Sequence, residues 1–182
     1  MNRETLREVT VFGLLLAIGV VGRWAQPTWN FTPLAAVTVL GGFYFRQTIT
    51  AVLLPVSILA VSDLLLPAHN SWPVQLSVHV MMIVPLLIGR AARNATGWQR
   101  PAWWVLGGVM PATVFYLVTN FAVWACTGLY DATFSGLAAC YAAGIPFYRS
   151  MLAGDVCYLT VLVTCLALAT AVRPQMAHPA QR

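Results

Sequence analysis

Charged and hydrogen-bonding side chains inside otherwise apolar stretches are the residues of this chain that could do chemistry. Arg23 and Asp63 each follow a long aliphatic run. His79 lies within another, and Arg149 and Asp155 stand near the start of the last one. A charged side chain at the centre of a bilayer costs about 2.5–3.5 kcal/mol on insertion scales, so such residues usually face a cavity and have a function. Their positions predict a polar site near one end of the apolar segments.

Charge pairing is the structural alternative for the same residues. Arg23 with Asp63 would form one neutral pair that fixes the packing of two helices. Arg149 with Asp155 or Asp131 would form a second. An aspartate can do both, since it can hold the wall of a cavity while facing it. The sequence leaves both interpretations open.

A histidine and an amide–aromatic pair extend the candidate site. His79 is either a hydrogen-bonded interior histidine or a ligand-facing imidazole, because neutral imidazole commonly coordinates transition metals such as cobalt. Asn120 and Trp124 are four residues apart and share a helix face. They favour either a polar contact between helices or a wall for a ring-bearing ligand. The residues expected to bind ligand at this level are Arg23, Asn30, Asp63, Trp72, His79, Asn120, Trp124, Tyr130, Tyr148, Arg149 and Asp155.

The composition is that of an integral membrane protein. Hydrophobic residues make up 59% of the chain and charged residues only 8%, whereas soluble domains carry about 25% charged residues. The 182 residues allow one compact bundle of helices. The net charge of +5 indicates membrane topology, and no nucleic-acid partner is expected. The four cysteines are expected to be small apolar filler, with a disulfide between Cys126 and Cys140 as the alternative.

Hydropathy predicts an all-α bundle of six transmembrane helices in a single domain over residues 1–173. A span needs about 20 mostly apolar residues, and the second segment is shorter than that. Residues 136–144 predict a re-entrant or interfacial helix, and residues 174–182 a disordered cytoplasmic tail. The predicted spans are residues 8–25, 31–45, 48–66, 73–92, 102–126 and 147–171.

The arginines orient this bundle. All ten basic residues are arginine, and eight fall on one side of the six predicted spans. The positive-inside rule makes that side cytoplasmic, with both termini inside, as in a bacterial inner membrane. The first span is expected to stay uncleaved because no A-x-A site follows it. The eight are Arg3, Arg7, Arg46, Arg90, Arg93, Arg100, Arg173 and Arg182.

Several catalytic motifs are absent from the sequence. It has no Walker A loop, so ATP hydrolysis by this chain is not expected. It has no HExxH motif, and Ser135-Gly136 lacks the flanking pattern of a serine nucleophile. No inverted repeat is visible, which disfavours a self-contained alternating-access carrier. We therefore expect no enzyme and no intrinsic cofactor.

Three stretches resemble the substrate-binding S-components of energy-coupling factor vitamin transporters, and more specifically a group of bacterial six-span proteins related to them. The resemblance implies a receptor that binds a vitamin or similar micronutrient from outside. It also implies two kinds of partner, a membrane coupling subunit and two ATPases. The stretches are residues 30–36 leading to 41–45, residues 62–64, and residues 119–124 through 128–130 to 146–149 and 154–155.

The resemblance also implies a docking face and a first ligand. S-components often dock through two alanines four residues apart on the first helix, and Gly13 and Ala17 stand at that place. Some members of the wider family take up cobalamin. His79 would then coordinate the cobalt of a bound corrinoid, while Trp72, Trp124 and Tyr130 cover the ring.

Two other classes of function compete with this interpretation. A membrane scaffold or assembly subunit would use its charges only for internal pairing. A membrane-embedded enzyme would use His79 and an aspartate as acid and base. Tolerance of charge-pair swaps would favour the scaffold, and detection of turnover would favour the enzyme.

Overall fold

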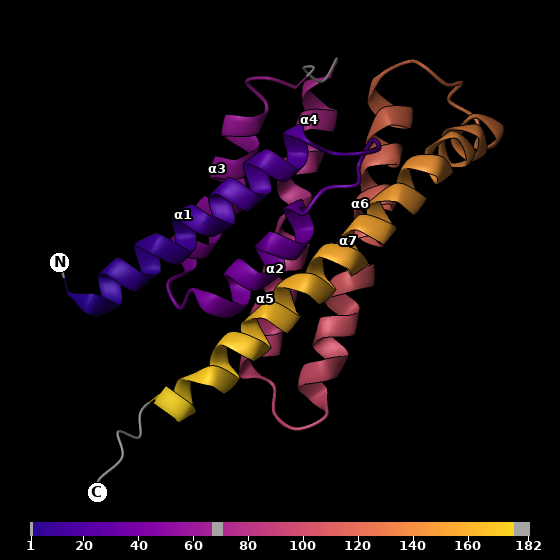
Figure 1. The fold of residues 1–182 in the computed structure, drawn as a ribbon. Helices are drawn as coiled ribbons and strands as arrows, with labels where there is room; N and C mark the ends of the chain where they lie inside the picture. Colours follow the sequence, from indigo (N-terminus) through magenta and orange to yellow (C-terminus); the bar gives the residue numbers. More distant parts are fainter. Residues whose placement is uncertain (1, 67–70, 177–182) are drawn as a thin grey trace, which may run out of the picture.

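The computed structural model describes residues 2–66 and 71–176, and all regular secondary structure within them is helical (Figure 1). The expectation of an all-α chain is therefore confirmed for this part of the protein. Its helices are α1 (Arg3–Trp24), α2 (Leu34–Tyr44), α3 (Thr48–Ser62), α4 (Trp72–Met81), α5 (Ile83–Asn94), α6 (Gln99–Cys126) and α7 (Phe134–Met176).

Four helical segments among the described residues are long and apolar enough to cross a membrane. They are α1, the joined α4 and α5 over Trp72–Asn94, α6, and Phe134–Thr170 of α7. The helices α2 and α3 are apolar but have only 11 and 15 residues. The predicted second span is thus a short helix, and α3 also falls below the usual length of a span.

The helix α2 lies at the centre of the fold. Every residue from Leu34 to Gly42 is buried. Its closest neighbour is α5, because glycines remove side chains at both contact points. A Cβ atom on Gly42 would lie 2.3 Å from the Leu86 carbonyl oxygen, and one on Gly89 would lie 1.9 Å from the Val39 carbonyl oxygen. The two backbones therefore touch directly.

Prolines and polar residues set the helix ends around this centre. Asn30 has a φ of 67°, a left-handed conformation that asparagine tolerates better than most residues, and it turns the chain between α1 and α2. Pro85 cannot donate a backbone hydrogen bond to the preceding turn. The helical segment from Trp72 to Asn94 accordingly breaks at Met82, whose N–H bonds to the His79 carbonyl oxygen at 3.2 Å.

The last helix differs from the sequence-based prediction. Residues 136–144 are not a separate re-entrant or interfacial helix, because α7 is continuous from Phe134 to Met176. Pro146 lies inside it, and proline bends a helix without necessarily ending it. In Figure 1 the first turns of α7 run at an angle to the long remainder. The helix also includes residues 174–176, the start of the predicted tail, while residues 177–182 lie outside the described residues.

Candidate ligand-binding cavity

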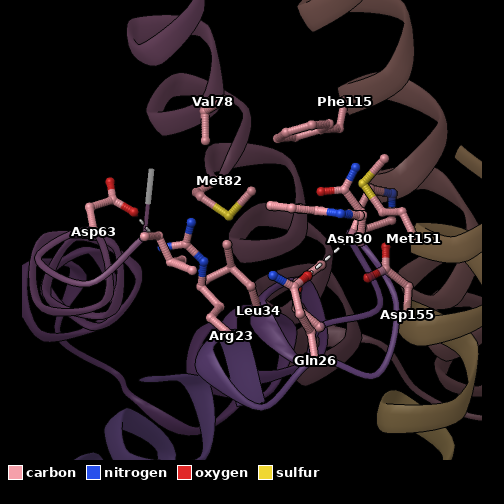
Figure 2. A pocket seen from close by; sticks show the side chains of 15 residues that line it. Arg23, Gln26, Asn30, Leu34, Asp63, Val78, Met82, Phe115, Met151 and Asp155 are labelled. Atoms are coloured by element: carbon pink, nitrogen blue, oxygen red, sulfur yellow. Dashed lines mark hydrogen bonds and ion pairs between the residues drawn. The ribbon is translucent and has the colours of Figure 1, made fainter. Parts of the chain in front are cut away.

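A cavity of about 410 Å³ lies where six of the helices and the α1–α2 loop meet. It lies at the end of α1 and α3, at the start of α2, and beside the junction of α4 with α5. The helices α6 and α7 close the opposite wall (Figure 2). Its lining residues are Arg23, Gln26, Trp29, Asn30, Thr32, Leu34, Ala35, Asp63, Leu66, Val78, Met82, Pro111, Phe115, Met151 and Asp155.

An ion pair forms one end of the cavity. The Arg23 guanidinium donates from Nη1 to Asp63 Oδ1 at 2.8 Å and also to the Ser62 hydroxyl. Trp24 Nε1 donates to the Ser62 carbonyl oxygen at 3.0 Å, so the end of α1 is fastened to the end of α3. The exposed fractions of the Arg23 and Asp63 side chains are 13% and 27%. The pair is therefore partly shielded from solvent and neutral as a unit.

The α1–α2 loop forms a polar wall next to this pair. The Asn30 backbone N–H donates to Gln26 Oε1 at 2.9 Å, which fixes the Gln26 side chain, and both residues line the cavity. The Thr28 and Ser150 hydroxyl oxygens are 2.8 Å apart and join the loop to α7. Gly154 allows this close approach, because a Cβ atom there would lie 3.2 Å from the Phe31 Cα atom.

Asp155 lies at the other end, without a charged partner. It is 2% exposed, and its Oδ2 atom is buried with no hydrogen-bond partner among the described residues. The Ala112 backbone amide on α6 lies beside the same carboxyl group. An ionised or polar group that is buried and unmatched carries a large desolvation cost, so buried carboxylates are normally paired. Asp155 is an exception that faces a cavity.

Apolar side chains separate the two polar ends. Figure 2 shows Asp63 and Arg23 on one side and Asp155, Met151 and Asn30 on the other. Leu34, Val78, Met82 and Phe115 lie between and above them. Such a cavity can hold a small molecule with an apolar body and polar groups at its ends. No cluster of three or more histidine, cysteine or acidic residues that could hold a metal ion occurs in the part of the chain that was described.

Four of the predicted site residues meet in this cavity: Arg23, Asn30, Asp63 and Asp155. Of the two predicted charge pairs, Arg23–Asp63 forms. The second does not, because Arg149 is exposed and makes no ion pair with Asp131 or Asp155 in this structure.

His79 and Trp72 do not line the cavity. Val78 and Met82 are four residues apart on the junction of α4 and α5 and face it together. His79 is one residue, and so about 100° of helical rotation, away from Val78. Its Nδ1 atom is 2.9 Å from the Gln75 carbonyl oxygen of its own helix. Trp72 begins α4 and is 74% exposed.

The remaining predicted residues belong to the contact between α6 and α7. Asn120 donates from Nδ2 to the Tyr116 carbonyl oxygen at 2.8 Å and packs against Gly144. The Trp124 indole N–H donates to the Asp131 carbonyl oxygen at 2.9 Å.

Tyr148 and Cys140 also belong to this contact, whereas Tyr130 lies in the loop between the two helices. The Tyr148 hydroxyl is 3.2 Å from that of Thr113, and Tyr130 lies half-buried in the loop after α6. Cys140 is buried and donates to the Asn120 carbonyl oxygen at 3.3 Å. All four cysteines are free, so the alternative of a disulfide between Cys126 and Cys140 is not realised.

Most of the lining was not anticipated from the sequence. The spacing of Gln26 and Asn30 could have indicated a shared polar wall. Val78 and Met82 share the same four-residue spacing, but aliphatic residues at that spacing are common in any apolar helix. The unanticipated lining residues are Gln26, Trp29, Thr32, Leu34, Ala35, Leu66, Val78, Met82, Pro111, Phe115 and Met151.

Comparison with known protein families identifies a match over almost the whole chain. The model of a family of unknown function, DUF6580, matches residues 3–177. No curated protein and no solved structure matches the chain. The matched region includes all the helices and every residue that lines the cavity.

Proposed function

We propose that this chain, which belongs to DUF6580, a family of unknown function, is a membrane-embedded receptor. It captures a small organic molecule from outside the cell for uptake. One observation carries the proposal. Polar side chains from separate elements converge on a cavity of about 410 Å³ inside an otherwise apolar bundle. Ligand pockets typically have volumes of about 300–1,000 Å³ and a mainly apolar lining with a few polar groups.

The surface of the helices supports a membrane location. Apolar side chains are exposed along α1, α6 and α7, for example Leu14, Val105 and Val161, at 59%, 69% and 59%. A helix that is apolar on all sides is typical of a protein core or a bilayer. We propose that all six helical segments are embedded, with α2 and α3 spanning only part of the bilayer thickness.

The positions of the charges support an outward-facing cavity. Arg7 lies near the start of α1, Arg46 between α2 and α3, and Arg93 near the end of α5. The cavity lies at the opposite ends of α1, α2 and α3. By the positive-inside rule the arginine-rich end faces the cytoplasm. This arrangement fits a bacterial inner membrane protein with both termini in the cytoplasm.

Transport would depend on partners, as in the S-components that the chain resembles. The sequence contains no ATP-hydrolysing motif. Gly13 and Ala17 are exposed on α1, and a Cβ atom on Gly13 would meet no other atom within 4 Å. This small-residue face supports docking on a coupling subunit, which would work with two ATPases.

The size and lining of the cavity favour a ligand smaller than a corrin ring. The expected cobalt ligand, His79, is outside the cavity and bonds within its own helix. Trp72, Trp124 and Tyr130 are also outside it. We therefore propose a small vitamin-like or micronutrient molecule and not a corrinoid.

The rival functions receive less support. A pure scaffold accounts for the Arg23–Asp63 pair but gives no role to the unpartnered Asp155 carboxyl group. An enzyme that used His79 with an aspartate as acid and base would need both in one site, and His79 does not share the cavity with Asp63 or Asp155.

Native mass spectrometry of the purified protein tests the proposal. The wild type should carry a co-purified small molecule that is released on unfolding. Val78→Trp should abolish that signal, because Val78 lines the cavity and a larger side chain would fill it. Val80→Trp is the matched control, since Val80 is 41% exposed on the same helix. Absence of any bound molecule in wild-type protein from several expression media, together with no uptake phenotype, would contradict the proposed function.

A further inference from the structure

We propose that the ligand carries a positively charged nitrogen, such as a protonated amine or a quaternary ammonium group, and that the Asp155 carboxylate is its counter-ion. The inference rests on the proposed function, because it identifies the chemical class of the molecule that the cavity captures. It gives Asp155 a charged partner, which no described residue of the protein supplies.

The first step is the lack of a charged protein partner for Asp155 in the part of the chain that the structure describes. Its Oδ2 atom is buried and makes no hydrogen bond among the described residues. The nearest basic residue along α7, Arg149, is exposed and unpaired with it. The one cavity-lining arginine, Arg23, is already engaged by Asp63. A cationic group from the ligand would therefore supply the missing partner.

The second step is the charge of the lining. Its ionisable residues are one arginine, Arg23, and two aspartates, Asp63 and Asp155. The first two neutralise each other, which leaves the Asp155 carboxyl group without a countercharge in the lining. Charges interact more strongly in a poorly solvated interior than in water, so a bound cation would stabilise the carboxylate form of Asp155, whereas a bound anion would not.

The third step is the shape of the rest of the ligand. From Asp155 the cavity passes Met151, the Phe115 ring and the Met82 thioether, and it ends at the Arg23–Asp63 pair (Figure 2). Thioether and aromatic side chains accommodate flat apolar groups. The ligand class is thus a small organic cation with a ring or other apolar body and a hydrogen-bonding group at the far end.

A charge series on one molecular frame tests the inference with protein purified in detergent. The probes are 2-phenylethylammonium, 2-phenylethanol and phenylacetate, which have similar apolar bodies and are cationic, neutral and anionic. We expect the ammonium probe to raise the melting temperature of the protein at millimolar concentration. The apparent affinity for the alcohol should be at least tenfold weaker, and the carboxylate should cause no stabilisation. The alcohol also controls for partition into detergent.

Substitution of the counter-ion gives a second, independent readout. Asp155→Asn keeps the size of the side chain and should lower the affinity for the ammonium probe at least tenfold while leaving that for the alcohol unchanged. Asp131→Asn, at an exposed aspartate outside the cavity, should leave both unchanged. If Asp155→Asn does not fold, the charge series on the wild type decides alone.

Each opposite result would overturn the inference. It fails if the alcohol or the carboxylate binds as well as the ammonium probe, if no ammonium probe stabilises the wild type, or if Asp155→Asn binds the ammonium probe normally. It also fails if the molecule that co-purifies with the wild type has no basic or quaternary nitrogen. That last result would leave the proposed capture function standing, whereas failure of the capture function would appear as no bound molecule at all.

Discussion

Arg23 is the residue that joins the stability of the fold to the shape of the cavity. Its guanidinium bonds to the Asp63 carboxylate and the Ser62 hydroxyl at the end of α3, while its side chain lines the cavity. The two partners are consecutive residues on the neighbouring helix, so one side chain fixes where α1 and α3 end relative to each other. The Arg23–Asp63 ion pair therefore both fixes the packing of α1 against α3 and forms part of the cavity wall.

Removal of this guanidinium should destabilise the protein. Arg23→Ala leaves the partly buried Asp63 carboxylate without a partner, and hydrogen bonds to charged groups contribute about 1.5–3 kcal/mol. We expect the free energy of unfolding to fall by about that amount, measured by SDS titration in mixed micelles with circular dichroism. Arg149→Ala is the matched control and should change it by less than about 0.5 kcal/mol, because Arg149 is exposed and forms no ion pair. Equal effects of the two substitutions would contradict this role for Arg23.

Some residues that line the cavity could be predicted from the sequence because they are charged, and others could not because they are aliphatic. Arg23, Asp63 and Asp155 stand out because a charge in an apolar segment needs a reason, wherever the helix points. Val78 and Met82 carry no such signal, since an aliphatic residue that lines a cavity looks like one that faces lipid. His79 does not line the cavity. The direction of its side chain depends on the rotation of α4 about its axis, and only packing against neighbouring helices fixes that rotation.

Close backbone contact between α2 and α5 is the main packing feature at the level of helices. Gly42 meets the Leu86 carbonyl oxygen and Gly89 meets the Val39 carbonyl oxygen. Neither obstacle is a flexible side chain, so the helices themselves would have to separate to admit a methyl group. The short helix α2 is held at the centre in this way, with its first residues at the cavity.

Alanine at these glycines should therefore be costly. Gly42→Ala and Gly89→Ala should each lower the free energy of unfolding by about 1–3 kcal/mol or more, because overpacking forces backbone shifts. Gly13→Ala provides the control, since its new methyl group would meet no atom within 4 Å. That substitution should leave stability unchanged or raise it by about 0.5–1 kcal/mol through helix propensity. The same SDS titration measures all three, and a tolerated Gly89→Ala would contradict the close contact.

The contact between α6 and α7 makes a finer prediction. A Cβ atom on Gly144 would lie 2.6 Å from Asn120 Oδ1, which belongs to a side chain that can be removed. Gly144→Ala should destabilise the protein by about 1 kcal/mol or more. In the Asn120→Ala background the same change should cost less, with a coupling energy of about 0.5–3 kcal/mol in a double-mutant cycle. Additive effects would mean that Asn120 does not pack against Gly144.

The fold at the level of helices was predictable in its main outline but not in the course of α7. Long apolar runs reveal helices because their length and composition suffice, and five of the six predicted segments coincide closely with helical segments. Residues 136–144 were predicted as a separate element before the predicted span 147–171, and Pro146 lies between the two. The chain continues as one bent helix instead, because proline in a helix removes one hydrogen bond without preventing the next turn.

At the scale of the whole molecule, α3 connects the arginine-rich end of the bundle to the end that holds the cavity, and these two ends define the orientation of the protein in the membrane. It begins after Arg46 and Gln47, at the arginine-rich end, and it ends at Ser62 and Asp63, beside the cavity. Its 15 residues separate these ends by about 22 Å at 1.5 Å per residue. Single cysteines just outside the two ends of this one helix therefore report the orientation of the cavity.

Labelling of Leu64→Cys and Gln47→Cys with a membrane-impermeant maleimide makes the test, in a background without the four native cysteines. Both positions are exposed, Leu64 by 80%. In spheroplasts, where the outer surface of the inner membrane is accessible, Leu64→Cys should react and Gln47→Cys should react only after lysis. This follows because arginine-rich segments are retained on the cytoplasmic side. The reverse pattern would place the cavity at the cytoplasmic face, where capture of a molecule from outside is impossible, and labelling of both before lysis would mean that α3 does not separate two compartments.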